Sequence, residues 1–286
     1  MEKLKRPVYL KPETDDFFKK IRKQVNETVL QNSSLYLSNI IKSLGLVIIF
    51  FLFYACILLF GNSTPLLFLF YIFCGITMIV LFINAFHDAA HGAFFKKAKH
   101  NQWFMNILEL FGSNHWLWTR RHINLHHAYP NIPDWDVDIK QSDIIRIFPK
   151  SPLFDYHKYQ HIYMWLIYPL YSLNWIYIRD FKDFFSKKNN YIKKVVNKIP
   201  MKEAYKLFAA KAFNLFYLLF IPMLSLNQHW YMVLLAWITM HMCGSIIGVV
   251  ITSIIKRMQK NMIFLTLHIR FIMLLDPISE CLKIMV

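Results

Sequence analysis

Residues 86–131 read FHDAAHGAFFKKAKHNQWFMNILELFGSNHWLWTRRHINLHHAYPN, and the rest of the chain is organised around this segment. It holds two histidine clusters, HDAAH at 87–91 and HINLHH at 122–127, joined by an aromatic-rich stretch. The rest of the fold must therefore hold these two clusters in place.

The spacing within each cluster matches one face of a helix. Residues four apart on a helix have Cβ atoms roughly 6 Å apart, so His87 and His91 can grip one metal ion. The same holds for His122 and His126. His127 points about 100° away from His126, so it can reach a second ion beside the first.

A histidine pair at helical spacing also arises from packing or chance, and His87 with His91 alone would suggest no more. The second cluster changes this interpretation. An HxxxHH run directly after Arg120 and Arg121 is a poor choice for packing in a hydrophobic core, and its imidazoles would repel one another if protonated. The five imidazoles of the two clusters indicate a metal site, and imidazole suits iron, zinc, copper and nickel. The predicted metal ligands are His87, His91, His122, His126 and His127.

The composition indicates an integral membrane protein. Of 286 residues, 56% are hydrophobic and only 17% are charged, which is too apolar for an ordinary soluble domain. The cysteines form no CxxC pair, which argues against a disulfide scaffold or structural zinc. They are Cys56, Cys74, Cys243 and Cys281.

Four apolar runs predict an all-α membrane domain with four transmembrane helices arranged as two hairpins. The predicted spans are residues 40–60, 66–86, 207–224 and 230–255. Residues 94–121 and 162–178 are interpreted as interfacial helices rather than further spans, because charged, polar or proline residues interrupt them. Together with the central loops they form a cap over one end of the hairpins.

The net charge of +16 follows membrane topology and forms no concentrated stripe for nucleic acid. The turns at 61–65 and 225–229 carry no lysine or arginine, whereas residues 1–42 carry nine and residues 87–204 carry seventeen. The positive-inside rule therefore places both termini, the cap and both histidine clusters on the cytoplasmic side.

Three aspartates follow the second cluster, at Asp134, Asp136 and Asp138. Carboxylates near metal-binding histidines often accept a hydrogen bond from the ring and so orient it. A solvated acidic loop is an equally good interpretation of the same residues.

A metal at the edge of a membrane bundle can reach an aliphatic chain that enters from the lipid. Oxidation of unactivated C–H bonds needs a strong oxidant, which iron with dioxygen supplies and zinc, having no redox chemistry, does not. The spacing of the histidines alone does not distinguish the two metals.

The two clusters resemble the first and second histidine boxes of membrane fatty-acid desaturases, with HDAAHG at 87–92 and RRHINLHHAYPN at 120–131, followed by NIPDWDVDI. They are most similar to the front-end, linoleoyl-CoA-desaturase-like branch, which HKYQHIY at 157–163 and YSLNW at 171–175 also resemble. The similarity runs from about residue 30 to residue 253.

The resemblance implies a di-iron enzyme that uses dioxygen as co-substrate to insert a double bond into a fatty acyl-CoA or acyl-lipid chain. The five box histidines would be iron ligands. The electrons would come from a separate ferredoxin-type or haem-carrier partner, because this chain shows no such domain of its own.

The sequence departs from the family's pattern after the fourth span. The family's third box, (H/Q)xxHH, is absent, and His268 is the one histidine in the tail at 256–286. We therefore expect a single desaturase-like domain over 1–286, with an interfacial segment at 1–39, an apparently truncated cap and an atypical tail that is cut short or frame-shifted near Ser253.

Such a site would be incomplete, and we expect poor metal binding and impaired activity. The other histidines that could substitute as ligands are better explained as interfacial or packing residues. They are His157, His161 and His241.

Three rival interpretations remain open. One is a membrane di-iron hydroxylase or oxygenase of lipids, which differs in the fate of the substrate radical. Another is a membrane zinc protease, disfavoured because Asp88 stands where HExxH has its glutamate base. The third is a catalytically inactive desaturase-like protein.

Overall fold

The computed structural model describes the chain at residues 7–8, 19–20, 23–24, 27, 33–133, 135–138, 143–149, 151–185 and 199–260, with the backbone alone at 33–36 and 253–260. Every regular element within these residues is helical and no strand is present there, as predicted. The predicted interfacial segment at 1–39 and the tail at 256–286 lie largely outside the described residues.

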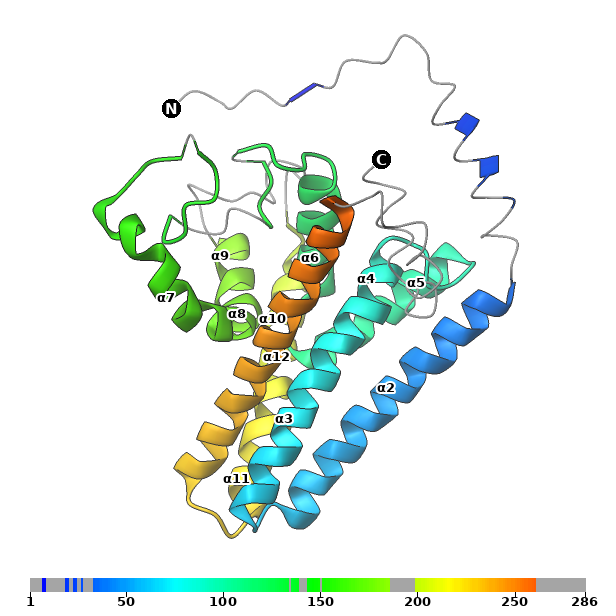
Figure 1. The fold of residues 1–286 in the computed structure, drawn as a ribbon. Helices are drawn as coiled ribbons and strands as arrows, with labels where there is room; N and C mark the ends of the chain where they lie inside the picture. Colours follow the sequence, from blue (N-terminus) through cyan, green and yellow to red (C-terminus); the bar gives the residue numbers. More distant parts are fainter. Residues whose placement is uncertain are drawn as a thin grey trace.

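Long apolar helices form the body of the molecule (Figure 1). Three of them are α2 (Ser33–Phe60), α3 (Thr64–Leu81) and α12 (Trp230–Lys260). The other consists of α10 (Met201–Leu215), the π-helical η9 (Phe216–Phe220) and α11 (Ile221–Ser225), which follow one another without a break. Four stretches of the described chain are long and apolar enough to cross a membrane, namely Leu37–Phe60, Thr64–Ala90, Met201–Ser225 and Trp230–Thr252. The four predicted spans are confirmed, with ends shifted by a few residues.

The two hairpins are tied together at their turns. The Gln228 side chain donates hydrogen bonds to the carbonyls of Gly61 at 3.2 Å and Asn62 at 2.7 Å. The Asn62 side chain accepts a hydrogen bond from the Asn227 backbone N–H at 2.7 Å. Polar turn residues from each hairpin thus satisfy backbone groups of the other, which fixes the relative height of the two hairpins.

Helices α3 and α12 pack closely because glycines lie at their contact. A Cβ added to Gly75 on α3 would lie 2.0 Å from the Met240 carbonyl oxygen on α12. A Cβ added to Gly244 would lie 2.8 Å from the Gly75 carbonyl oxygen. Small residues allow such close approach of membrane helices, where packing drives association. This contact holds the helix that leads into the first histidine cluster.

Shorter helices gather at the end of the bundle away from the two turns and form the cap (Figure 1). In chain order they are η2 (Phe82–Phe86), α4 (His87–Ala90), α5 (Ala98–Met105), η3 (Asn106–Phe111), α6 (His115–Arg121), η4 (His122–His126), η5 (Asp155–Tyr159), α7 (Gln160–Ile167), η6 (Tyr168–Leu170), α8 (Tyr171–Asn174), η7 (Trp175–Arg179) and α9 (Asp180–Phe185). Neither 94–121 nor 162–178 forms a candidate span, as predicted.

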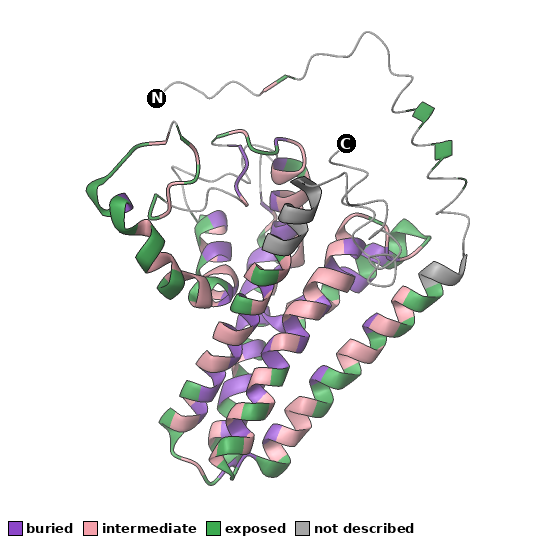
Figure 2. Ribbon diagram, in the orientation of Figure 1, coloured by how far each residue is buried: buried purple, intermediate pink, exposed green. Residues whose placement is uncertain are grey.

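Buried residues line the inside of the bundle and the base of the cap, whereas exposed apolar side chains cover the outside (Figure 2). Leu52 and Leu59 on α2 are 58% and 71% exposed, as expected for residues that face lipid. The Phe86 ring stacks on Phe104 at 5.3 Å and meets Phe111 edge-on at 5.7 Å. This aromatic contact anchors the chain just before the first histidine cluster.

Candidate metal centre

The first cluster lies where the second span leaves the apolar bundle. The π-helical η2 ends with the His87 N–H bonded to the Phe82 carbonyl, and α4 follows directly. The helix stops at Gly92, which has a φ of +73°, a left-handed conformation that glycine adopts without steric cost. π-Helical segments occur often at functional sites.

A buried asparagine holds the loop that follows the first cluster. The Asn101 side chain accepts a hydrogen bond from the Phe95 N–H at 2.8 Å and donates to the Phe95 carbonyl at 2.7 Å. It also donates to the Gly92 carbonyl at 3.2 Å. One side chain therefore satisfies three backbone groups and fixes the exit of the chain from the cluster.

The second cluster begins on α6 and continues as a π helix. Asn114 caps α6, because its side-chain oxygen accepts a hydrogen bond from the Leu117 N–H at 2.9 Å. The following η4 has i→i+5 bonding, and the His127 N–H bonds to the His122 carbonyl at 2.9 Å. This wider turn brings residues five apart toward the same face.

Four of the five predicted ligands converge. One ring nitrogen from each of the four lies within 4.8 Å of all the others, and all four side chains are half-buried. The group consists of His87, His91, His122 and His127. The Nε2 atoms of His122 and His127 face each other at 3.0 Å. Two segments that are distant in sequence thus supply one nitrogen-lined site.

Each predicted pair falls within one candidate group, His87 with His91 in the first and His122 with His126 in the second. The expectation that His127 turns away toward a second ion assumed an α helix throughout. Because η4 is π-helical, His127 lies with His122 toward the first cluster. His126 instead belongs to a neighbouring group with His122 and Asp138.

Two of the three loop aspartates pair with ring nitrogens. Asp138 Oδ2 lies 2.7 Å from Nδ1 of His122, and Asp136 Oδ1 lies 2.7 Å from Nδ1 of His126. This confirms the interpretation of these carboxylates as partners that orient the rings. If each Nδ1 carries the shared proton, Nε2 presents its lone pair to a metal. Asp134 lies outside the described residues.

The electrostatics of the site favour the neutral form of His91 and His127. Burial, followed by the neighbouring imidazoles, lowers the pKa of His91 to about 4 and that of His127 to about 3. Burial alone would raise the pKa of Asp138, but the hydrogen bond and charge of His122 lower it below the ordinary value. The charges of Arg179 and Arg121 lower the pKa of Asp138 further. Neutral imidazole beside ionised carboxylate is the state that binds a metal cation.

The residues fit a metal ion. The Nε2 atom of His91 is buried and has no hydrogen-bond partner within the described structure. A buried nitrogen without a partner is costly in an ordinary core, and here it belongs to the four-histidine group. An all-imidazole set without cysteine suits iron, zinc, copper or nickel, among which zinc has no redox chemistry.

The histidines considered as substitute ligands lie elsewhere. His157 contacts the Asp143 carbonyl at 2.8 Å, His161 is exposed, and His241 is buried in α12 against Ser172. None of the three belongs to either candidate metal group among the described residues. The buried His241 is a packing residue, whereas an interfacial position for His157 and His161 stays a prediction. His268 lies outside the described residues.

Sequence reasoning missed the aromatic wall of the site. The Trp118 ring stacks on His122 with centroids 5.0 Å apart, and Phe82 packs edge-on against Trp118 at 5.0 Å. The sequence did carry a signal for this contact: Trp118 stands four residues before His122, a spacing that places two side chains on the same face of a helix. These rings close the side of the site that faces the bundle.

Comparison with known proteins decides the family. The profile of the fatty acid desaturase family matches residues 62–253, which contain both histidine clusters. This chain belongs to the fatty acid desaturase family. No solved structure matches the chain.

Its curated relatives in this desaturase family act on acyl lipids, as their names state. The chain is 26% identical over 219 residues to the acyl-lipid (8-3)-desaturase of Physcomitrium patens, covering 75% of this chain and 45% of that protein. It is 36% identical over 97 residues to the sn-1 linoleoyl-lipid 6-desaturase of Arthrospira platensis, covering 32% and 25% respectively. It is 28% identical over 148 residues to the enzyme of the same name from Synechocystis sp., covering 52% and 40%.

The chain thus spans less than half the length of these relatives. They are front-end desaturases, which confirms the branch that the sequence resembled.

Proposed function

We propose that this desaturase-family chain forms the histidine part of a di-iron centre that introduces a double bond into a membrane-bound acyl chain. One observation carries the proposal. Ring nitrogens from two separate histidine boxes lie within 4.8 Å of one another at the end of a membrane-spanning helix. A redox metal held there is within reach of a lipid tail that enters from the bilayer.

The proposed ligands of one iron are the members of the four-histidine group: His87, His91, His122 and His127. His126, on the other side of His122, would contribute to a second iron. When bound, iron with dioxygen supplies the oxidising power to remove two hydrogens from neighbouring carbons while dioxygen is reduced to water.

The chain's own residues prepare this site. Asp138 and Asp136 hold protons on Nδ1 of His122 and His126, so that Nε2 is the nitrogen that each ring would offer to a metal. Trp118 and Phe82 cover the side of the site toward the bundle with aromatic surface. Apolar walls limit the access of water to the reacting carbons.

The proposed substrate is an acyl group in a membrane lipid or a thioester, which the names of the relatives support. Electrons would come from a separate donor of the ferredoxin or haem-carrier type. The charge asymmetry of the chain supports a cytoplasmic position for the cap and the metal centre.

The test is product analysis in a host that leaves linoleoyl lipids unmodified. The chain is expressed with iron supplied, and total acyl groups are analysed by gas chromatography with mass spectrometry. The proposal predicts an acyl chain with one additional double bond, in low yield because the metal site is expected to be incomplete. This product disappears in the His127→Ala variant. A hydroxylated product at the same position would show that the chain is an oxygenase of another type.

A further inference from the structure

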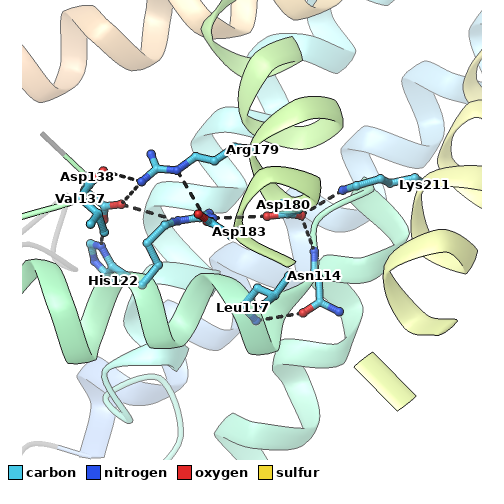
Figure 3. A network of polar contacts seen from close by, with 10 residues as sticks. Asn114, Leu117, His122, Val137, Asp138, Arg179, Asp180, Asp183 and Lys211 are labelled. Carbon is cyan, nitrogen blue, oxygen red and sulfur yellow. Dashed lines mark hydrogen bonds and ion pairs between the residues drawn. The ribbon is translucent and has the colours of Figure 1, made fainter. Parts of the chain in front are cut away.

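Six charged side chains lie packed behind the second histidine cluster (Figure 3). Three are cations and three are anions, namely Arg121, Arg179 and Lys211 with Asp138, Asp180 and Asp183. All except the half-buried Asp138 are less than 10% exposed. Charges are costly to bury unless they are paired, so this set is a built network.

One end of the network ties the cap to the third span. Arg121 forms an ion pair with Asp183 and lies 3.4 Å from Asp180. Lys211 on α10 lies 3.0 Å from the other oxygen of Asp180. Asn114 donates its N–H to that same oxygen at 3.2 Å. These contacts join α6, α9 and α10 into one unit. Arg121 also approaches the loop that carries Asp138, with its Nε 3.8 Å from Oδ1 of Asp138.

Arg179 lies at the other end of the network and contacts the loop that carries Val137 and Asp138. Its Nη2 donates to the Val137 carbonyl and lies 3.4 Å from Oδ1 of Asp138. The second carboxylate oxygen, Oδ2, lies 2.7 Å from Nδ1 of His122. One carboxylate therefore bridges Arg179 and a proposed metal ligand, with a different oxygen for each partner (Figure 3).

We propose that Arg179 is a positioning residue of the metal centre, which holds Asp138 so that His122 directs Nε2 into the four-histidine group. Its guanidinium contacts the Val137 carbonyl and Asp138 through Nη2 while its Nε lies 3.9 Å from Oδ2 of Asp183, and a lysine ammonium does not reproduce this planar arrangement. The inference rests on the proposed metal site and adds a residue from outside both histidine boxes.

The test is Co²⁺ titration of the purified, metal-free, full-length protein in detergent, followed by its visible ligand-field absorption. Arg179→Lys keeps the charge and loses the planar fork, so we expect roughly 10-fold weaker Co²⁺ binding and an altered spectrum. Arg146→Lys is the matched control. Arg146 also holds a loop through carbonyls, those of Ser151 and Pro149, and it is not part of either metal group.

A double-mutant cycle separates positioning from general stabilisation. If Arg179 acts through Asp138, Asp138→Asn combined with Arg179→Lys binds Co²⁺ no more weakly than Asp138→Asn alone. If the fold-losses in Co²⁺ affinity of the two single variants multiply in the double variant, the inference is overturned. It is also overturned if Arg179→Lys has the Co²⁺ affinity and spectrum of the parent protein. Should Arg179→Lys fail to fold, the charge-neutral pair Asp138→Asn with Arg179→Gln replaces it in the same comparison.

The outcomes also distinguish this inference from the proposed function. If the parent protein binds no Co²⁺, the metal site itself is wrong. If the parent and Arg179→Lys bind equally well, the metal site stands and only the role of Arg179 is refuted.

Discussion

His122 and His127 face each other through their Nε2 atoms at 3.0 Å, although they stand five positions apart in the chain. The π-helical turn over His122–His126 produces this contact. Two nitrogen lone pairs at this distance repel unless a proton or a cation lies between them. The contact therefore makes His127, rather than His126, the closer partner of the first cluster.

His127→Ala should weaken Co²⁺ binding by the four-histidine group more than His126→Ala does. Loss of a partner outside the ligand set typically costs about 10–100-fold in metal affinity, and loss of a ligand should cost more. His161→Ala is the control, since His161 is exposed and belongs to neither candidate group. A larger loss in His126→Ala would instead support α-helical pairing of His122 with His126.

The metal-free protein should lose stability in acid. The pKa values of His91 and His127 are about 4 and about 3 in the folded state, because of burial and the neighbouring imidazoles. In the unfolded chain both titrate near 6.5, so below about pH 6.5 the unfolded state binds more protons. The stability that these two rings contribute is complete above that pH and is lost progressively as the pH falls through the folded values.

The measurement is the Tm of the metal-free protein in detergent between about pH 7.5 and about pH 4.5. The double variant His91→Gln with His127→Gln should show a shallower fall in Tm. An identical pH dependence in parent and variant would contradict this origin of the acid sensitivity.

Gly75→Ala should destabilise the bundle. The added Cβ would lie 2.0 Å from the Met240 carbonyl oxygen, so α3 and α12 must separate. Overpacking of this kind typically costs about 1–3 kcal/mol. Gly45→Ala on α2 is the matched control, because nothing lies within 4 Å of a Cβ there. Thermal unfolding in detergent should give a lower Tm for Gly75→Ala alone, and equal Tm values would refute the close packing.

Much of this fold could be predicted from the sequence, because apolar runs of membrane-spanning length are an unambiguous signal. The third span shows the limit. It was predicted to begin at residue 207 and begins at Met201, because Glu203 is charged yet buried in the first turn of the helix. A hydropathy pattern counts such residues as solvent-exposed, so it shortens the helix.

The candidate site could be predicted only in part. Spacing identified the five histidines, and proximity to the second cluster suggested Asp136 and Asp138. The π turn was not predictable, because helical spacing assumes i→i+4 bonding. Arg179 was not predictable either, since it is one of 33 lysines and arginines and its partner is distant in the chain.

The central claim is that the imidazoles of two histidine boxes hold a redox metal together. X-ray absorption at the iron edge, with metal analysis, tests it most directly on the purified protein loaded with iron. We predict a first shell dominated by imidazole nitrogen, matching the four-histidine group. We also predict fewer than two irons per chain, because the two candidate groups of the described residues share His122 and so have six different side chains between them. A shell of oxygen or sulfur ligands, or no bound iron, would contradict the account.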